Sequence, residues 1–126
     1  MKLTNSTILN STNGLNSISQ KQLPVKVSYA IAKNLAKLES EIKVYNSERN
    51  KLIELYADKD GEGKVIHKDN GQVTFTGTGL EGWIKDIALL DAEECEVDIH
   101  TFKIELLEGY DVSALELIAI DYMIEA

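Results

Sequence analysis

One uninterrupted segment constrains the fold of this chain more than any other feature. From Pro24 to Ala57 the sequence has no glycine and no further proline, and proline suits the first turn of an α-helix. Large side chains recur within this segment at steps of four and three residues, as along the seam of an amphipathic helix. The seam positions are Ile31, Leu35, Leu38, Ile42, Tyr45, Arg49, Leu52 and Tyr56. The sequence therefore predicts one long amphipathic helix over residues 24–57.

The length of this helix raises a packing question. A helix over 24–57 spans roughly 50 Å, whereas a compact domain of this chain length is about 36 Å across. An apolar seam that extends beyond its own domain is usually covered by another helix. We expect a homo-oligomer in which the seam residues from Ile31 to Leu52 meet a second copy. The alternative is a monomer in which the first helix folds back along the seam.

Shorter patterns predict the remaining elements. The turn sequence at 69–71 lies between two alternating runs and predicts a hairpin, and Ser113 with Glu116 has the spacing of a helix capping box. The fold class is α+β, with a small antiparallel sheet and further short helices beside the long one. In order, a single domain over 1–126 contains a helix over 4–19, the long helix over 24–57, a hairpin over 64–76, a helix over 79–92, a strand region over 95–106 and a helix over 114–125.

Composition limits the partners and the compartment. The net charge of −8 and the sequence pI near 4.7 argue against binding to a nucleic acid polymer or an anionic membrane, because such binding needs clustered cations. No signal-peptide pattern or membrane-spanning run is present. The single cysteine, Cys95, forms no intrachain disulfide, so nothing requires an oxidising compartment. We expect a cytoplasmic protein.

Arg49 is the only arginine in the chain and falls on the apolar seam. In one interpretation its stem packs in the seam and its guanidinium pairs with a glutamate of a neighbouring helix, such as Glu48 or Glu54. In the other, the guanidinium lines a pocket between helices and binds a phosphate or carboxylate beside Tyr45 and Tyr56. Both interpretations remain open from the sequence.

A basic patch lies on the side of the long helix away from the seam. It comprises Lys26, Lys33 and Lys37, with Tyr29 among them. Solvated lysines are the ordinary explanation of such a face. The alternative is that the patch, together with an aromatic residue such as Trp83, binds an anionic ligand by charge and stacking.

The motifs of catalysis and metal binding are poorly represented. Residues 58–65 resemble the start of an EF-hand loop, but the expected glutamate and following helix are missing. Glu96, Asp98 and His100 alternate as they would on any half-solvated strand. Cys95 lies among glutamates, which oppose the thiolate that a nucleophile needs. We therefore expect no enzymatic activity, no metal site and no cofactor.

Three segments carry a resemblance to a known family. "LPVKVSYAIAKNLAKLE", "EVDIHTFKIELLEG" and "VSALELIAIDYMIE" resemble a family of small uncharacterised proteins encoded by phages and prophages of Gram-positive bacteria. The resemblance covers most of the chain, but the family has no established activity and provides no functional residue to carry over. It implies a phage origin and a role inside the infected bacterial cell or in virion assembly.

Two functions follow as hypotheses. The first is a non-catalytic phage protein that counters host defence in the cytoplasm of the infected bacterium, either by sequestering a signalling nucleotide between subunits or by blocking a defence protein with its acidic surface. The second is a virion or assembly component, such as a connector or tail chaperone, that self-associates through the long helix. The expected ligand-binding residues are Arg49, Tyr45, Tyr56, Lys26, Tyr29, Lys33 and Trp83.

Overall fold

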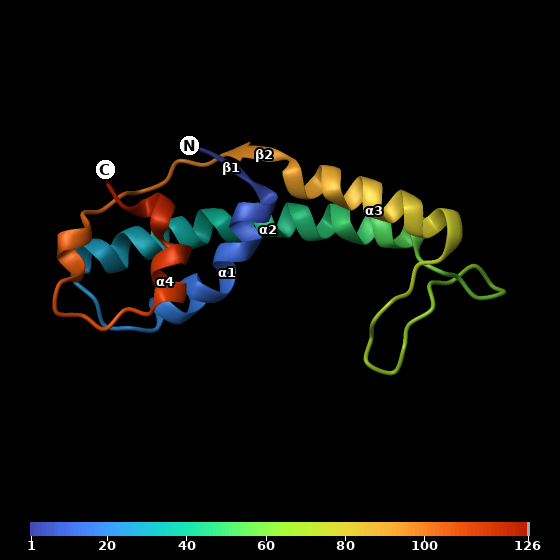
Figure 1. Ribbon diagram of the computed structural model, residues 1–126, viewed down its shortest axis with the longest axis horizontal. Coiled ribbons are helices and arrows are strands. Elements are labelled where there is room, and N and C mark those ends of the chain that lie inside the picture. The colour runs from blue at the N-terminus through green and yellow to red at the C-terminus, as the bar shows by residue number, and fades with distance from the viewer. Residues whose placement is uncertain (126) are drawn as a thin grey trace. The chain divides into compact units, whose positions relative to one another are not determined.

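The computed structural model describes residues 1–125, and the chain divides into two compact units (Figure 1). The first unit comprises residues 1–42 and the residues from 94 onward, and the second comprises residues 43–93. Helix α2 (Val25–Tyr56) begins directly after Pro24 and contributes residues to both units. This is where the sequence predicts a long helix over 24–57. The expectation of a single domain over 1–126 stays a prediction.

The first unit combines helices with a small antiparallel sheet, so the chain is α+β as predicted. Its sheet pairs two three-residue strands, with Leu3 opposite Cys95. In chain order, the further elements of this unit are β1 (Lys2–Thr4), α1 (Asn5–Ser19), β2 (Glu94–Glu96), the 3₁₀ turn η1 (Ile104–Leu107), α4 (Ala114–Ala119) and the 3₁₀ turn η2 (Asp121–Met123). β1 carries no distinctive sequence pattern and was not expected.

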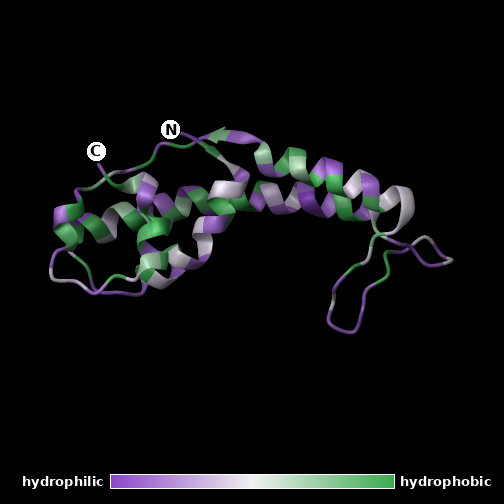
Figure 2. Cartoon of the chain, in the orientation of Figure 1, coloured by the Kyte–Doolittle hydropathy of each residue, from purple (hydrophilic) through white to green (hydrophobic). Residues whose placement is uncertain are grey.

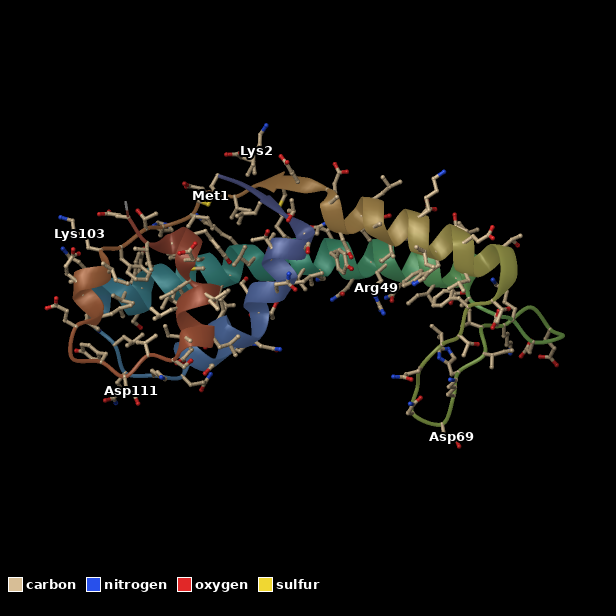
Figure 3. All side chains as sticks on the ribbon, viewed as in Figure 1. Met1, Lys2, Arg49, Asp69, Lys103 and Asp111 are labelled. Atoms are coloured by element: carbon tan, nitrogen blue, oxygen red, sulfur yellow. The ribbon has the colours of Figure 1, made fainter. Side chains whose placement is uncertain are left out.

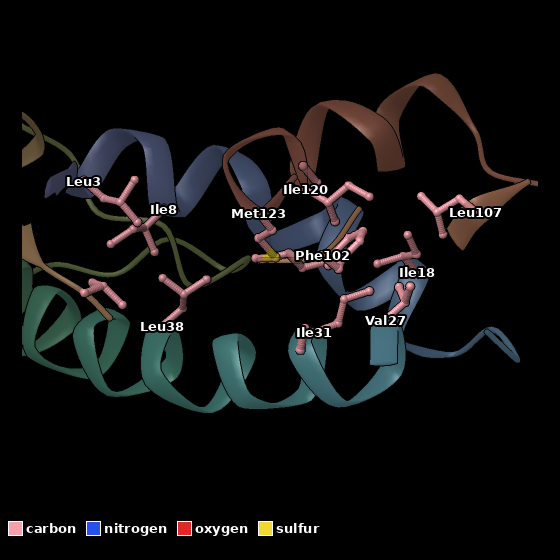
Figure 4. Close-up of a cluster of buried hydrophobic side chains, with 14 residues drawn as sticks. Leu3, Ile8, Ile18, Val27, Ile31, Leu38, Phe102, Leu107, Ile120 and Met123 are labelled. Atoms are coloured by element: carbon pink, nitrogen blue, oxygen red, sulfur yellow. The ribbon is translucent and has the colours of Figure 1, made fainter. Parts of the chain in front are cut away.

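The core of the first unit lies between α1, the first part of α2 and the C-terminal segment (Figure 4). Helix α1 has many poor helix formers, but it buries Ile8, Leu15 and Ile18 along one face. Tertiary packing of such a face supplies most of the stability of a helix with weak propensity. The core residues are Leu3, Ile8, Leu15, Ile18, Val27, Ala30, Ile31, Leu38, Val97, Phe102, Leu107, Ala119, Ile120 and Met123.

Helices α1 and α4 approach each other closely at a glycine. A Cβ atom on Gly14 would lie 2.4 Å from the Cβ of Ala119 and 3.0 Å from the carbonyl oxygen of Leu115. The helix can therefore carry no side chain at position 14 without displacing α4. The capping box predicted for the start of α4 is confirmed, because Ser113 and Glu116 bond reciprocally.

The second unit consists of the last part of α2, a loop over 57–76, and α3 (Gly77–Ala92). Helix α3 packs against the end of α2 through two glycines. A Cβ atom on Gly79 would lie 2.5 Å from the carbonyl oxygen of Tyr56, and one on Gly82 would lie 2.3 Å from the Tyr56 ring. No residue of α3 reaches full burial. The helix predicted over 79–92 begins two residues earlier than expected, at Gly77. Its N-cap residue, Thr76, makes no side-chain capping bond.

The hairpin predicted over 64–76 does not form regular strands. The segment turns where the sequence predicts, with Lys68 N donating to Gln72 O at 2.8 Å, but only isolated bridges join Lys59 to Val65 and His67 to Val73. The tip of the loop is hydrophilic (Figure 2). A two-stranded ribbon needs a hydrophobic face packed on something else to be stable. Here Phe75 stacks on Trp83, but residues 66–72 are exposed.

Two other predicted elements are wrong in extent. The strand region over 95–106 is a strand only as far as Glu96, and η1 replaces its end. The last helix, predicted over 114–125, ends at Ala119 and continues as η2. Ile120 and Met123 are both buried in the core, while Ile124 forms a parallel bridge with Phe102.

Candidate functional site

The first unit contains a cavity of about 370 Å³ between the start of α2 and the segment after β2. We call it the lysine pocket. Its lining residues are Lys26, Tyr29, Ala30, His100, Thr101, Phe102, Lys103, Leu106 and Glu125. Pockets of this volume are large enough for a small organic ligand.

A buried asparagine brings the two walls of the lysine pocket together. The Asn34 side chain is fully buried on α2. Its Nδ2 donates to the carbonyl oxygen of His100 at 2.9 Å, and its Oδ1 accepts from the His100 backbone N–H at 2.7 Å. Backbone bonds from Phe102 to Met123 and from Glu125 to Phe102 hold the same segment on its other side. These bonds therefore fix residues 100–102 although this segment lies outside the regular strands of the described chain.

The lysine pocket combines positive charge with an exposed aromatic ring. The Tyr29 ring is 57% exposed; its centroid lies 6.2 Å from that of His100 in an edge-on arrangement, and the Lys33 ammonium lies 5.6 Å from the ring centroid. Within residues 1–125, Lys26, Lys33 and Lys103 take part in no ion pair. Glu125 is the acidic residue of the lining. The pocket is thus a local excess of cations on an acidic chain.

The structure brings together three of the residues predicted to bind a ligand and places the others elsewhere. Lys26 and Tyr29 line the lysine pocket, and Lys33 lies over Tyr29. Lys37 is used differently, since its ammonium donates to the carbonyl oxygen of Asp98 at 2.6 Å. Trp83 belongs to the second unit.

The two tyrosines predicted to accompany Arg49 are bonded to carboxylates of α3. Tyr45 donates to Asp91 at 2.6 Å, and Tyr56 donates to Asp86. Burial and the bond to Asp91 raise the pKa of Tyr45 to about 12, and the bond to Asp86 raises the pKa of Tyr56. Carboxylate neighbours repel anions. We therefore infer that the hydroxyl groups of Tyr45 and Tyr56 join α2 to α3 and do not contact an anionic ligand.

Arg49 is exposed at the surface of the second unit, where its guanidinium carbon lies 5.8 Å from the Trp83 ring centroid. The Trp83 ring in turn stacks on Phe75, with centroids 4.4 Å apart. Arg49 forms no ion pair among residues 1–125, and its neighbour Glu48 pairs with Lys51 at 2.9 Å instead. No ion pair joins Arg49 to a glutamate within residues 1–125, and pairing with a glutamate of a second copy stays a prediction.

The other seam residues are covered by the chain itself. Ile31, Leu38 and Tyr45 are buried without a second copy, and Leu35, Ile42 and Leu52 are partly buried. An exposed seam was the reason to expect self-association along α2. That reason no longer holds for the three buried side chains, and self-association itself stays a prediction.

The acidic loop after α2 uses its carboxylates to hold its own backbone. Asp58 accepts from the hydroxyl groups of Thr74 and Thr76, each at 2.8 Å, which lowers its pKa. Asp60 accepts from the backbone N–H groups of Glu62 and Lys64. No group of three His, Cys, Asp or Glu residues in the described part of the chain is arranged to hold a metal ion.

Two further observations concern reactivity and membranes. Burial raises the pKa of the Cys95 thiol, and Glu41 and Glu96 raise it further. A thiol in this setting is a poor nucleophile. Among residues 1–125, no helix has both the length and the apolar character needed to cross a bilayer.

Sequence reasoning missed His100, Lys103 and Asn34 as parts of one site. Helical spacing puts Asn34 in one row with Val27 and Ala30, and alternation puts His100 on a polar strand face. Neither pattern gives information on contacts between positions 66 residues apart. The one local signal was the polar Asn34 in an otherwise apolar row. A buried amide of this kind needs partners, and here they are backbone groups.

Comparison with known proteins adds no relative: no family model, curated protein or solved structure matches this chain.

Proposed function

We propose that this chain is a non-catalytic binding protein that holds a nucleotide-class ligand in the lysine pocket. Lys26 and Lys103 would contact the phosphate, and the base would lie against Tyr29. The observation that carries the proposal is the gathering of cations around an exposed aromatic ring at one cavity. Positive charge and a stacking surface are the two features that nucleotides require.

We propose binding rather than catalysis, since within residues 1–125 the hydrogen bonds of His100 are made by its backbone and none joins its ring to another side chain of the lysine pocket. His100 stands alone there with lysines and one carboxylate. In the infected bacterial cell that the family resemblance implies, a protein of this kind would withhold a signalling nucleotide from host defence. Because one chain lines the pocket, this role needs no second subunit.

Calorimetric titration of the full chain with adenosine monophosphate, guanosine monophosphate and a cyclic dinucleotide tests this function. We expect saturable binding of at least one of them. Replacing Lys26 and Lys103 together by glutamine should weaken that binding at least about tenfold, because each lost charge-assisted contact contributes about 1.5–3 kcal/mol.

A matched control removes the same charge elsewhere. The exposed lysines Lys43 and Lys85 belong to the second unit and line no part of the lysine pocket. Their double replacement by glutamine should leave the affinity within about twofold. Equal weakening by both double variants would indicate general attraction to the ligand rather than a site. No saturable heat with any nucleotide would contradict the proposed function.

A role in virion assembly is the second candidate, and exposed apolar side chains in the second unit favour it. Val44, Leu55, Ile84 and Leu89 are each about three-fifths exposed. Where exposed apolar side chains form one patch, they often mark a site of protein–protein interaction. Light scattering would measure self-association, and purified particles would contain the chain if it is a virion component. A monomer that is absent from particles and dispensable for their formation would contradict this role.

A further inference from the structure

The second unit has a wide cleft of about 680 Å³ between α2 and the loop over 67–75. We call it the Arg49 cleft, after the residue labelled in Figure 3. The residues that matter for its chemistry are Arg49, Asn50, Glu54, Gln72, Val73 and Phe75. None of them belongs to the first unit, so the Arg49 cleft is independent of the lysine pocket.

The Arg49 guanidinium is the cation of this cleft; it lies against an aromatic ring and forms no ion pair within residues 1–125. Trp83 lies beneath the guanidinium of Arg49, and Phe75 stacks on Trp83 with an interplanar angle of 14°. Contact with an aromatic face restricts the guanidinium without using its N–H donors. Since Arg49 has no ion pair within residues 1–125, its fork of donors is available for a planar anion.

The rest of the lining matches a peptide better than a phosphate ester. Asn50 and Gln72 each offer an amide group that both donates and accepts, as a peptide backbone requires. Val73 and Phe75 provide an apolar surface beside them. Only one arginine is present, and Glu54 lies in the same cleft, so a ligand with several negative charges would be repelled.

Base stacking is also disfavoured here, because the Trp83 ring already contacts Phe75 and Arg49. The lysine pocket differs in this respect, since Tyr29 remains largely exposed. A single carboxylate next to an apolar side chain, on an extended backbone, matches the Arg49 guanidinium, the two amide side chains and the apolar surface of the Arg49 cleft.

We propose that the Arg49 cleft binds an extended peptide segment of a protein partner, with one aspartate or glutamate carboxylate on the Arg49 guanidinium and an adjacent apolar side chain against Val73 and Phe75.

Trp83 is the only tryptophan in the chain, so its fluorescence reports directly on ligand binding beside Arg49. The probe is the blocked tripeptide acetyl-valyl-aspartyl-leucinamide, titrated into the full chain. We expect a saturable change in Trp83 emission. The otherwise identical asparaginyl peptide should bind about 10-fold to 100-fold more weakly, because a charge-assisted pair is replaced by a neutral bond.

Two variants test the assignment of residues. Arg49→Gln should abolish the preference for the aspartyl over the asparaginyl peptide, and Glu54→Gln should strengthen aspartyl binding by removing a like charge. Lys43→Gln makes the same charge change as Arg49→Gln outside the cleft and should leave the preference intact. All three positions are exposed, so circular dichroism should show unchanged folding.

Three results would overturn the proposal. The first is equal binding of the two peptides, or no saturable change up to millimolar concentration. The second is an unchanged preference in Arg49→Gln. The third is a change in Trp83 emission that Arg49→Gln abolishes and that adenosine monophosphate or inorganic phosphate produces at lower concentration than the aspartyl peptide, which would make the cleft a phosphate site. Nucleotide binding in the lysine pocket is measured by calorimetry with other variants, so the two proposals fail separately.

Discussion

At the scale of single residues, two buried polar side chains join segments that are far apart in the sequence. Asn34 satisfies both backbone groups of His100. Glu116 accepts from the Lys21 ammonium at 2.7 Å and from the Ser17 hydroxyl at 3.0 Å. Because a buried donor or acceptor without a partner is costly, each of these side chains fixes one arrangement of the chain.

Replacing Asn34 by leucine should destabilise the protein by about 2–5 kcal/mol. The substitution removes the partners of the His100 N–H and C=O groups, whose bonds to Asn34 are part-buried, and a polar group left unsatisfied away from water costs about 1–3 kcal/mol. Urea denaturation at pH 7 measures the change. The exposed Asn46 on the same helix is the control, and Asn46→Leu should change stability by no more than about 0.5 kcal/mol. Equal effects at both positions would contradict the anchoring role of Asn34.

Glu116 should make stability depend on pH in the acid range. Its bond to Lys21, followed by the backbone N–H of Ser113, lowers its pKa from 4.5 to about 2. A lowered pKa means that the carboxylate stabilises the fold above pH 4.5 and that this stabilisation is lost as the pH falls from 4.5 towards 2. Glu116→Gln should therefore be less stable than the parent at pH 7, by about 1–3 kcal/mol.

The difference between Glu116→Gln and the parent should shrink below pH 4.5, because protonation removes the same charge in the parent. Urea midpoints of both proteins from pH 7 to pH 2 give the comparison. Glu105→Gln is a suitable control, since Glu105 is exposed and forms no ion pair within residues 1–125. A difference that stays constant down to pH 2 would show that the Glu116 carboxylate has no special stabilising role.

At the scale of elements, two glycine contacts set how closely helices pack. Gly14 brings α1 against α4, while Gly82 brings α3 against the Tyr56 ring of α2. Neither position has the positive φ that explains a glycine by backbone conformation. Close approach of a neighbour is therefore the reason for a glycine at both places.

Gly14→Ala should destabilise the protein, although alanine is the better helix former by about 1 kcal/mol. The added methyl would lie 2.4 Å from Ala119, and overpacking of this kind costs about 1–3 kcal/mol. Thermal unfolding should show a lower midpoint. Gly61→Ala is the control, because its Cβ meets nothing within 4 Å. A midpoint that rises for Gly14→Ala would show that α4 moves aside freely.

How far each element could be predicted depends on how local its signal is. The starts of two helices could be predicted, because their signals act within a few residues. These signals are Pro24 ahead of α2, and Ser113 with Glu116 at the start of α4. The end of α4 at Ala119 could not be predicted, since the following residues keep an apolar helical pattern and Ile124 pairs with Phe102, far away in the sequence. One wall of the lysine pocket could be predicted, because helical spacing places Lys26 beside Tyr29 and Lys33 on α2. The other wall could not, because the contact of His100 with Asn34 joins distant positions.

At the scale of the whole molecule, the first unit contains most of the buried hydrophobic side chains and the second unit contains few. All fourteen members of the core cluster belong to the first unit. In the second unit, the buried hydrophobic residues are Tyr45 and Ala57, and α3 contributes none. Regions with little buried apolar surface open locally at low free energy. The second unit should therefore be the less stable of the two.

Hydrogen exchange followed by mass spectrometry measures this difference. Amide groups of α3 should exchange substantially faster than those of α1, although the two helices have similar length. The exposed residues of the loop over 57–76 should exchange faster still. Equal protection of α1 and α3 would contradict the expected order and would suggest that α3 gains cover from another molecule.

The bond of Asp58 to Thr74 and Thr76 has a consequence for how this sequence can change. The carboxylate closes the base of the loop, with the Asp58 N–H also donating to the Thr74 carbonyl oxygen at 2.9 Å. The tip at Asp69 projects away from that closure (Figure 3). Lengthening a loop whose ends are already tied costs little entropy. Extra residues or a reporter peptide could thus be inserted there with both helices left as they are.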